Sequence, residues 1–206
     1  MFKPEHKFTE SDVVTLSREL AYGSFLKVDR VKLKHRMFNG DWSPPILREV
    51  LVRERAVGVL LFDPKREEIV LVRQFRVGVM NDSQGAWILE IVAGMVSEKE
   101  QFSDVAIRET EEESGCKVLK LIEICEYYNS PGITNERVAL YCGLIDTTNV
   151  GGIHGLKEEH EDIASIVLPY KDAIHRLKSG RVNNPMTIIA LQWLMLNKSA
   201  IKKHEI

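Results

Sequence analysis

Apolar residues recur along this chain with two different spacings, and each spacing predicts one kind of element. Alternation of apolar and polar residues, or a short apolar run between turn residues, predicts a β-strand. Strands are therefore expected over residues 22–37, 55–62, 69–77, 86–94, 118–128, 136–145 and 163–170. Apolar residues at helical spacing predict helices that start after Phe102 and that span 171–180 and 184–200.

Local signals refine some of these elements. We expect Ser103 to cap the first helix and Gly115 to end it, and Pro185 suits the first turn of the last helix. The segment 146–162 is rich in glycine and poor in apolar residues, so it is expected to be a mobile loop. Trp87 and Trp193 lie in apolar runs, which predicts positions in the core.

A turn-rich stretch with two consecutive prolines, residues 38–45, divides the chain. Proline continues neither a helix nor a central strand, so we place a domain boundary just after this stretch. Residues 1–50 are expected to form a small N-terminal antiparallel β domain, and residues 51–206 a larger domain. Strands and helices alternate irregularly in the larger part, which predicts the α/β (α+β) class, with a mixed sheet covered by helices.

Composition narrows the class of protein without revealing its activity. Hydrophobic residues make up 44% of the 206 residues and charged residues 28%, a balance typical of globular proteins. The net charge of −2 gives no basic field for a nucleic-acid partner, and no apolar run approaches the roughly 20 residues of a membrane span. Three cysteines without a CxxC pair fit reduced thiols. We expect a cytoplasmic protein with neither a membrane nor a nucleic acid as partner.

The stretch RETEEESG, residues 108–115, contains four glutamates, and the helical wheel separates them. At about 100° per residue from the start of the helix, Glu109 falls near about 340° and Glu113 near about 20°, inside the apolar arc. Glu112 falls at the rim of that arc, near about 280°. Glu111 lies on the opposite side, where solvated charges belong. A solvated acidic face, the usual meaning of such a stretch, therefore explains Glu111 but not Glu109 or Glu113.

The carboxylates on the apolar side need a positive partner. Glu109 and Glu113 stand one turn apart, so their charges repel by about a few tenths of a kcal/mol even in water, and desolvation makes this repulsion more costly. Together with Glu112 they bring three carboxylates to one spot. Oxygen ligands favour Mg²⁺ or Mn²⁺, and the absence of His or Cys from the group argues against zinc. The helix thus predicts a metal site.

Residues around this helix also stand in a recognisable order: Gly94, Glu100, Arg108, Glu109, Glu112, Glu113 and Gly115. This pattern resembles the Nudix box, although Thr110 and Cys116 stand where bulky aliphatic residues are usual. Pro131, in SPG fifteen positions beyond Cys116, resembles a mark of the ADP-ribose pyrophosphatases within the Nudix family. HRMFNGDWS, GIHGLKEEHEDI and NNPMTIIALQWL are similar to segments of the bacterial members of that group. The likeness covers most of the chain and is weakest in the first twenty residues and in 77–86.

The resemblance implies a Nudix-type α/β/α sandwich and Mg²⁺-dependent hydrolysis of the pyrophosphate bond of ADP-ribose, giving AMP and ribose 5-phosphate. Mn²⁺ would be a substitute ion. By resemblance Glu109, Glu112 and Glu113 hold the metal ions, Glu112 and Glu113 being catalytic, and the carbonyl group of Ala93 is a further ligand. Gly94 is expected to make the tight turn that brings this carbonyl group near the helix.

The same resemblance assigns roles to neighbouring charges. Arg108 is expected to orient a carboxylate through an ion pair, and Glu100 to be structural. The charges at 158–162 would by themselves indicate a solvated run. Their match to the E-x-E-D pattern of the family makes Glu159 the general base and Glu161 a further metal ligand, on a glycine-rich lid.

Substrate contacts are also inferred from the resemblance. Arg76 is expected to reach a phosphate, whereas Arg73 is interpreted as an exposed charge at a strand edge. Arg48 and Glu49 resemble residues that approach the adenine from the partner subunit, and Glu136 is a further candidate for a substrate contact. For Arg48, Glu49, Arg76 and Glu136 an ordinary surface role stays open.

Dimerisation would explain the N-terminal domain. Members of the resembled family exchange N-terminal sheets in a homodimer, and a domain of about 50 residues is too small to be very stable alone. Residues 1–50 are therefore expected to be a dimerisation domain that is swapped between subunits.

Two other functions stay open at this stage. Another nucleoside-diphosphate sugar, such as GDP-mannose, would use the same box and loop. A non-catalytic ADP-ribose sensor would be expected to lack box carboxylates, whereas Glu109, Glu112 and Glu113 are all present. The sequence leaves open the preferred sugar nucleotide, the number of metal ions, the phosphorus that is attacked and the physiological role.

Overall fold

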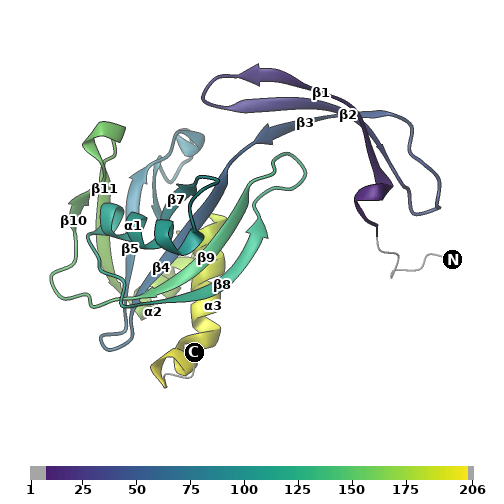
Figure 1. Ribbon diagram of the computed structural model, residues 1–206. Helices are drawn as coiled ribbons and strands as arrows, with labels where there is room; N and C mark the ends of the chain where they lie inside the picture. Colours follow the sequence, from purple (N-terminus) through teal and green to yellow (C-terminus); the bar gives the residue numbers. More distant parts are fainter. Residues whose placement is uncertain (1–7, 204–206) are drawn as a thin grey trace. The chain divides into compact units, whose positions relative to one another are not determined.

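The computed structural model describes residues 8–203 and divides the chain into two compact units (Figure 1). The first unit comprises Met1–Arg53 and Tyr128–Glu136, and the second comprises Glu54–Tyr127 and Arg137–Ile206. Residues 1–7 of the expected N-terminal domain lie outside the described residues. The turn at 128–136 belongs to the first unit through backbone contacts such as Leu51 N–H to the carbonyl oxygen of Ile133, at 2.8 Å.

The first unit is an antiparallel sheet in the order β1-β2-β3. After a short 3₁₀ turn, η1 (Glu10–Asp12), it consists of β1 (Val13–Gly23), β2 (Lys27–His35) and β3 (Ile46–Val52). The antiparallel strand predicted over 22–37 is confirmed as β2, which starts only at Lys27 because the chain turns after Gly23, whereas β1 was not predicted. Register shifts at Thr15/Ser17 and Leu20/Tyr22 interrupt the two-residue period of β1, so alternation could not reveal it.

The second unit contains an eight-stranded mixed sheet, with strand order β10-β11-β5-β4-β9-β8. Strand β6 pairs with β5, and β7 pairs with β4. Strands β4 and β9 are parallel. The strands are β4 (Arg55–Asp63), β5 (Glu68–Phe75), β6 (Trp87–Glu90), β7 (Val92–Val96), β8 (Lys120–Tyr128), β9 (Arg137–Leu144), β10 (Gly152–His154) and β11 (Ile163–Pro169). The helices are α1 (Phe102–Ser114), α2 (Tyr170–Lys178) and α3 (Pro185–Lys202), with 3₁₀ turns η2 (Val77–Val79) and η3 (Lys157–Glu159).

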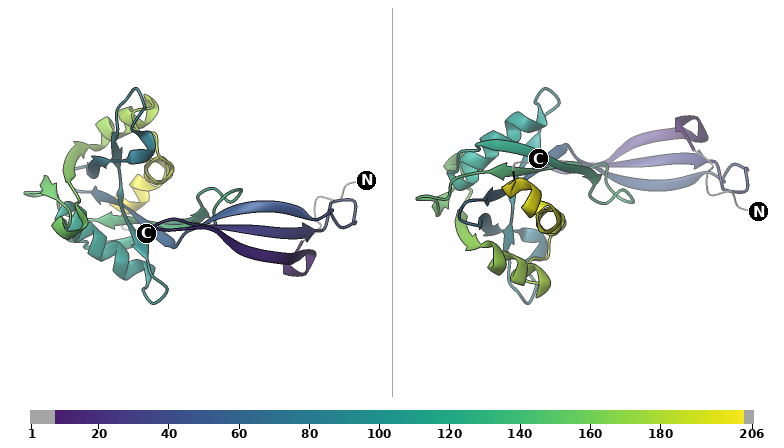
Figure 2. Two further views of the ribbon diagram at one scale, coloured as in Figure 1. Left: turned by 90° about the horizontal axis from the view of Figure 1, so that it is seen from above. Right: turned by 90° about the horizontal axis from the view of Figure 1, so that it is seen from below.

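Helices cover both faces of this sheet, which confirms the predicted α/β/α arrangement. Along β4, Val57, Val59 and Leu61 pack in the apolar cluster that includes residues of α1. The alternate residues Leu60 and Phe62 pack in a second cluster, with residues of α2 and α3. Since successive side chains of a strand point to opposite faces, α1 lies on one side of the sheet and α2 and α3 on the other (Figure 2).

The apolar run 86–94 forms two strands rather than the one expected, with Ile91 between them. One edge of β4 pairs first with β7, from Arg55 to Val59, and then with β5, from Leu61 to Asp63. Strand β5 in turn continues beyond β4 to pair with β6. The sheet therefore divides near Leu60, where the edge of β4 changes its partner from β7 to β5, and β7 packs against α1.

The helix ends agree with the predictions in part. Gly115 ends α1 in the left-handed conformation, with φ of 67°, as predicted. Ser103 does not cap this helix: Gln101 occupies the N-cap position, and Ser103 lies inside the first turn. Pro185 is in the first turn of α3, as predicted, and the side chain of Asn184 accepts a hydrogen bond there from Thr187 N–H.

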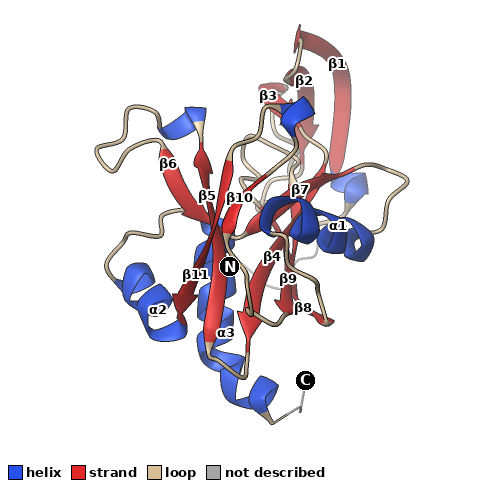
Figure 3. Cartoon of the chain, turned by 90° about the vertical axis from the view of Figure 1, so that its left-hand side faces the viewer, coloured by secondary structure: helices blue, strands red, loops and turns tan. Residues whose placement is uncertain are grey.

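The segment 146–162 is more ordered than the predicted loop, since it contains β10 and η3 (Figure 3). In the part of the chain that the structure describes, the helices are all too short or too polar to cross a membrane.

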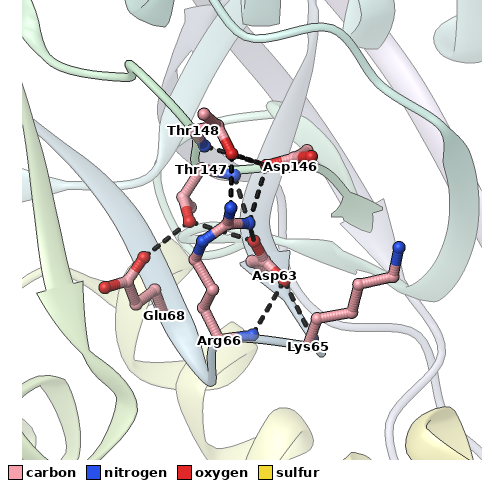
Figure 4. Close-up of polar contacts among 7 residues, drawn as sticks. All are labelled: Asp63, Lys65, Arg66, Glu68, Asp146, Thr147 and Thr148. Carbon is pink, nitrogen blue, oxygen red and sulfur yellow. Dashed lines mark hydrogen bonds and ion pairs between the residues drawn. The ribbon is translucent and has the colours of Figure 1, made fainter.

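A polar network ties the turn between β4 and β5 to the residues after β9 (Figure 4). Asp63 accepts hydrogen bonds from the backbone N–H groups of Arg66 and Thr147, and from the Thr147 hydroxyl at 2.9 Å. The Arg66 guanidinium donates to Asp63 at 3.0 Å and to Asp146 at 2.7 Å. The network supplies Asp63, which is 1% exposed, with donors on both of its oxygens.

Candidate active site

Helix α1 turns part of its acidic sequence toward the sheet. Glu113 is 3% exposed, and Thr110 on the same face is fully buried and donates its hydroxyl to the carbonyl oxygen of Ala106. Glu109 and Glu112 are half-buried, whereas Glu111 is exposed. The helical wheel thus separated the solvated glutamate from the other three correctly.

Gly94 allows Glu109 to lie against the sheet. A Cβ atom added at Gly94 would lie 2.3 Å from Cδ of Glu109, a distance that no real contact tolerates. The expectation that Gly94 makes a tight turn was wrong, because Gly94 lies within β7 and pairs with Val57 of β4. Glycine is needed here because strand and carboxylate approach each other too closely for any side chain.

Burial and like charges raise the pKa of Glu113 to about 8. Burial is the larger cause, and the neighbouring carboxylates of Glu109 and Glu161 add to it. The backbone N–H of Ala93 donates to Oε2 of Glu113 at 3.1 Å, which together with the charge of Arg76 lowers the pKa only partly. Glu113 is therefore a buried carboxyl group for which the protein provides little compensation.

Arg108 lies among the carboxylates at the rim. Its guanidinium pairs with Glu109 at 2.9 Å and with Glu112 at 2.7 Å, and Glu100 lies 3.9 Å away. The expected ion pair with a box carboxylate is thus present. Burial still raises the pKa of Glu109, because the attraction of Arg108 is opposed by repulsion from Glu112 and Glu161. Glu100 mainly accepts hydrogen bonds from the N–H and hydroxyl of Ser97, which is a structural role.

The segment after β10 approaches the C-terminal end of α1. The N–H of Gly155 donates to the carbonyl oxygen of Glu112 at 3.1 Å, and a Cβ atom added at Gly115 would lie 2.7 Å from the His154 ring. Glu161 accepts a hydrogen bond from Leu156 N–H at 3.0 Å, and its charge acts on Glu109 and Glu113. The loop therefore brings a fourth carboxylate to the group on α1.

Glu159, the predicted general base, lies on the exposed turn η3. The backbone of the next residue, His160, has φ of 57°, which is unusual for a residue with a side chain. The role of Glu159 stays a prediction, as does the role of the Ala93 carbonyl group as a ligand.

Arg76 pairs with Glu90, a buried carboxylate that the sequence analysis missed. The Nε atom of Arg76 lies 2.8 Å from Oε2 of Glu90, and Glu90 is 6% exposed. Burial raises the pKa of Glu90, and the charge of Arg76 partly offsets this effect. A glutamate in the apolar run 86–94 is a signal that could have been noticed, since an isolated charge in a buried strand requires a partner.

The other predicted substrate residues belong to the first unit. Arg48 and Glu49 are exposed neighbours on β3, where Glu49 pairs with Arg30 at 3.1 Å. Glu136 accepts a hydrogen bond from the Asn129 amide at 2.7 Å and lies 3.6 Å from Arg53. Their roles toward a substrate stay predictions.

The carboxylates suit a hard divalent cation, although their present arrangement is not that of a metal site. Within residues 8–203, no three His, Cys, Asp or Glu side chains are already arranged to hold a metal ion. Glu109 and Glu112 face Arg108 instead. All the side-chain donors are carboxylate oxygens, and burial, with repulsion from neighbouring carboxylates as the smaller cause, raises the pKa of Glu109 and of Glu113. A cation would compensate these negative charges.

Comparison with known proteins agrees with this geometry. The NUDIX domain model matches residues 52–187. ADP-ribose pyrophosphatase of Escherichia coli strain K12 is 40% identical over 205 residues, covering 98% of both chains. The Haemophilus influenzae protein of the same name is 36% identical, covering 95% of this chain and 92% of its own length.

More distant relatives share the domain or the fold. GDP-mannose pyrophosphatase of Cronobacter sakazakii is 31% identical over 151 residues, covering 72% of this chain and 78% of its own. A crystal structure described as an ADP compounds hydrolase superposes with a TM-score of 0.71 at 17% identity, over 97% of this chain and 100% of that one. The match of the NUDIX domain model to residues 52–187 and the acidic helix α1 between β7 and β8 lead to one assignment. This chain belongs to the NUDIX family of hydrolases.

Proposed function

We propose that this protein hydrolyses the pyrophosphate bond of ADP-ribose, releasing AMP and ribose 5-phosphate, and that it requires Mg²⁺. The observation that carries the proposal is the buried, poorly compensated Glu113, which lies beside Glu109 and within the field of Glu161. The near full-length likeness to proteins named ADP-ribose pyrophosphatase supports the choice of substrate.

In this proposal the carboxylates bind the cation, and the cation acts on the substrate and the attacking water. Glu109, Glu112, Glu113 and Glu161 would hold it, with the Ala93 carbonyl group as a further ligand. When bound, a divalent cation neutralises pyrophosphate charge and lowers the pKa of an attacking water molecule. Arg108 pairs with both Glu109 and Glu112, and a bound cation would replace its guanidinium group as their partner. Mn²⁺, which has similar ligand preferences, is expected to substitute.

Two residues would act on the substrate directly. Glu159 is proposed to take the proton from the attacking water, because it is exposed and lies close in sequence to Glu161. Arg76 is proposed to contact a phosphate while Glu90 holds its guanidinium group. Replacing Glu159 with Gln should lower turnover by about two to four orders of magnitude while ADP-ribose still binds. Near-normal turnover would remove Glu159 from the mechanism.

We also propose that the protein is a homodimer formed through the first unit. Among the described residues of this unit, Val31 is the one apolar side chain that is buried. Exposed apolar side chains are instead numerous: Val13, Val14, Leu16, Leu20, Tyr22, Phe25, Leu26 and Leu47. A sheet with so little core of its own is expected to be covered by a second copy. In that dimer Arg48, Glu49 and Glu136 would contribute to substrate binding.

We place the protein in the cytoplasm. Cys116, Cys125 and Cys142 are all free thiols, which suits a reducing compartment.

The test is hydrolysis of a substrate panel with Mg²⁺, with and without a chelator. ADP-ribose should give AMP and ribose 5-phosphate faster than GDP-mannose gives its products, and the chelator should abolish both reactions. Preference for GDP-mannose would favour the second candidate, which the Cronobacter sakazakii relative motivates. Binding of ADP-ribose without any product would identify a sensor and contradict an enzymatic function.

A further inference from the structure

The second unit has a basic cavity of about 270 Å³ that the proposed function leaves without a role. Its walls carry three arginines, a tryptophan and two side-chain amides: Arg73, Arg176, Arg181, Trp87, Gln84 and Asn183. Arg73 lies on β5, Trp87 on β6 and Arg176 on α2, while Arg181 and Asn183 follow α2. The cavity is thus built by elements that are distant in sequence.

This cavity lies on the face of the sheet away from α1. Leu89, which also lines it, packs in the cluster of α2 and α3, whereas the next residue, Glu90, points to the other face and pairs with Arg76. Likewise Arg73 follows Val72, which packs in the cluster of α1. In Figure 3, β6 and α2 lie on one side of the view and α1 lies on the other. The cavity is therefore separate from the acidic site.

The three guanidinium groups concentrate positive charge at this cavity. Arg66, Arg76 and Arg108 each pair with a carboxylate elsewhere in the second unit. By contrast, no ion pair joins Arg73, Arg176 or Arg181 to any carboxylate in the described range 8–203. None of the residues lining the cavity is acidic. Three like charges around one concavity repel one another, and a bound anion would relieve that repulsion.

The interpretation of Arg73 as a charge at a strand edge was wrong. Arg73 lies on β5 between two strands, with Leu89 of β6 and Ala164 of β11 as its neighbours. Its side chain is exposed because it points into the open cavity rather than into the core. An arginine held on an internal strand has a firmly positioned backbone, which favours a defined binding geometry.

Trp87 gives the cavity an aromatic wall. It is 60% exposed, so the prediction of a core position was wrong. The edge-to-face contact with Phe75, at 5.4 Å between ring centroids, orients the indole ring. An exposed and oriented indole ring is a surface on which a planar heterocycle can stack.

We propose that this cavity is a second nucleotide-binding site, which takes a nucleoside monophosphate. Arg73, Arg176 and Arg181 would bind the phosphate group, since guanidinium groups pair with phosphate oxygens in a bidentate manner. Trp87 would stack on the base, and the amides of Gln84 and Asn183 would hydrogen-bond to its edge. A volume of about 270 Å³ is more than an inorganic phosphate needs and is near the lower end of small-ligand sites, roughly 300–1,000 Å³.

Titration with AMP, followed by the tryptophan indole N–H signals in an NMR spectrum, tests this assignment. The chain has three tryptophans, and Trp87→Phe identifies the signal of Trp87. The titration is run in excess chelator, so that metal-dependent binding at the acidic helix does not contribute. AMP should shift the Trp87 signal in a saturable manner and leave those of Trp42 and Trp193 unchanged. No shift of the Trp87 signal would overturn the proposal.

Charge variants locate the phosphate. The double variant Arg176→Ala/Arg181→Ala should weaken AMP binding by about a hundredfold, at about tenfold for each charge-assisted contact. Lys178→Ala is the matched control, since Lys178 lies on α2 outside the cavity, and it should bind AMP like the unchanged protein. Arg176→Lys/Arg181→Lys keeps the charge and should bind with intermediate affinity. Unchanged affinity in both arginine double variants would contradict the role of these residues.

Two further ligands separate the phosphate from the base. Adenosine lacks the phosphate and should bind at least about a hundredfold more weakly than AMP. Inorganic phosphate should bind weakly and should not shift the indole N–H signal of Trp87. If phosphate binds as tightly as AMP, the base is not recognised and the nucleotide assignment is wrong. The experiment does not depend on hydrolysis, so the proposed function and this site can fail independently.

Discussion

Asp63 and Glu113 are both buried carboxyl groups of the second unit, yet their pKa values move in opposite directions. Burial by itself would raise the pKa of Asp63, but hydrogen bonds from the backbone and side chains of Thr147 and Arg66 outweigh it and hold the pKa well below its usual range. Burial likewise raises the pKa of Glu113, where one hydrogen bond from Ala93 and two neighbouring carboxylates leave it at about 8.

The contrast separates a carboxylate that the protein itself stabilises from one that we propose to bind a cation. Asp63 has its donors within the protein, so its charge ties two loops together (Figure 4). Glu113 has few donors and lies near like charges, so its ionised form is costly unless a cation compensates it. Burial alone does not identify an active site. Burial without compensating donors is the more useful signal.

Substitution of each carboxyl group should separate the two roles most clearly in turnover. Glu113→Gln should lower turnover of ADP-ribose by about three orders of magnitude, because a neutral amide is a poor cation ligand. Asp63→Asn should keep near-normal turnover per folded molecule, since Asp63 belongs to the structural network. Steady-state rates corrected for the folded fraction measure both effects. Comparable losses in the two variants would remove the distinction.

The same pair of variants should change the free energy of unfolding in opposite directions. In chelator at pH 8, Asp63→Asn should destabilise by about 3 kcal/mol, because several donors lose their acceptor. Glu113→Gln should stabilise under the same conditions, by on the order of a few kcal/mol, because the buried charge is removed. Urea denaturation gives both values. Destabilisation by Glu113→Gln would show that its charge is already compensated.

The pH dependence of stability should also differ in sign. The folded pKa of Glu113, about 8, exceeds the ordinary value of 4.5, so its contribution is fully present below pH 4.5 and is lost as the pH rises toward 8. The folded pKa of Asp63 is lowered, so its contribution is present above the ordinary value of 3.8 and is lost as the pH falls. Unfolding free energies in chelator between pH 3 and 8 should show a falling slope above pH 5 that Glu113→Gln reduces, the remainder coming from Glu109 and Glu90, whose pKa values are also raised.

A smaller effect is expected where Asp63 loses one of its donors. Thr147→Val should cost about 1–2 kcal/mol, because the Thr147 hydroxyl lies 2.9 Å from Asp63 and also contacts Glu68. Thr148→Val is the matched control, since the exposed Thr148 contacts Arg66 and Asp146 but not Asp63, and it should cost less. Thermal unfolding measures the difference. Equal losses would argue against a special need for donors at Asp63.

The smallest effect should come from the exposed glutamate of α1. Glu111→Gln should change the unfolding free energy by less than about 0.5 kcal/mol and leave turnover unchanged, because Glu111 faces solvent. Because Glu111 lies two residues from Glu113, Glu111→Gln removes the same charge from α1 and controls for the effect of helix charge alone. A large loss of turnover would mean that Glu111 takes part in cation binding.

Periodicity predicted most of the second unit and the orientation of α1. The strands of the central sheet consist of apolar runs, and a helix with apolar residues on one side can pack in only one orientation. Glu113 could therefore be placed near the core from its angle on the wheel. Strand β1 was not predicted because its register shifts interrupt the two-residue alternation of apolar and polar positions.

Long-range packing could not be predicted in the same way. The role of Gly94 depends on how closely Glu109 approaches β7, and the partner of Arg76 is a glutamate fourteen residues away at the end of β6. Trp87 is exposed although it lies in an apolar run, because its side chain lines an open cavity instead of packing in the core. Such contacts follow from the assembled sheet and not from local sequence.

The most direct test of the account compares unfolding free energies in chelator and in saturating Mg²⁺. A ligand that binds the folded state stabilises it, so the unchanged protein and Asp63→Asn should gain the same increment from Mg²⁺. Glu113→Gln should gain little, because it lacks the buried ligand. An equal gain in Glu113→Gln, or no gain in the unchanged protein, would contradict the claim that the buried carboxylates of α1 form a cation site.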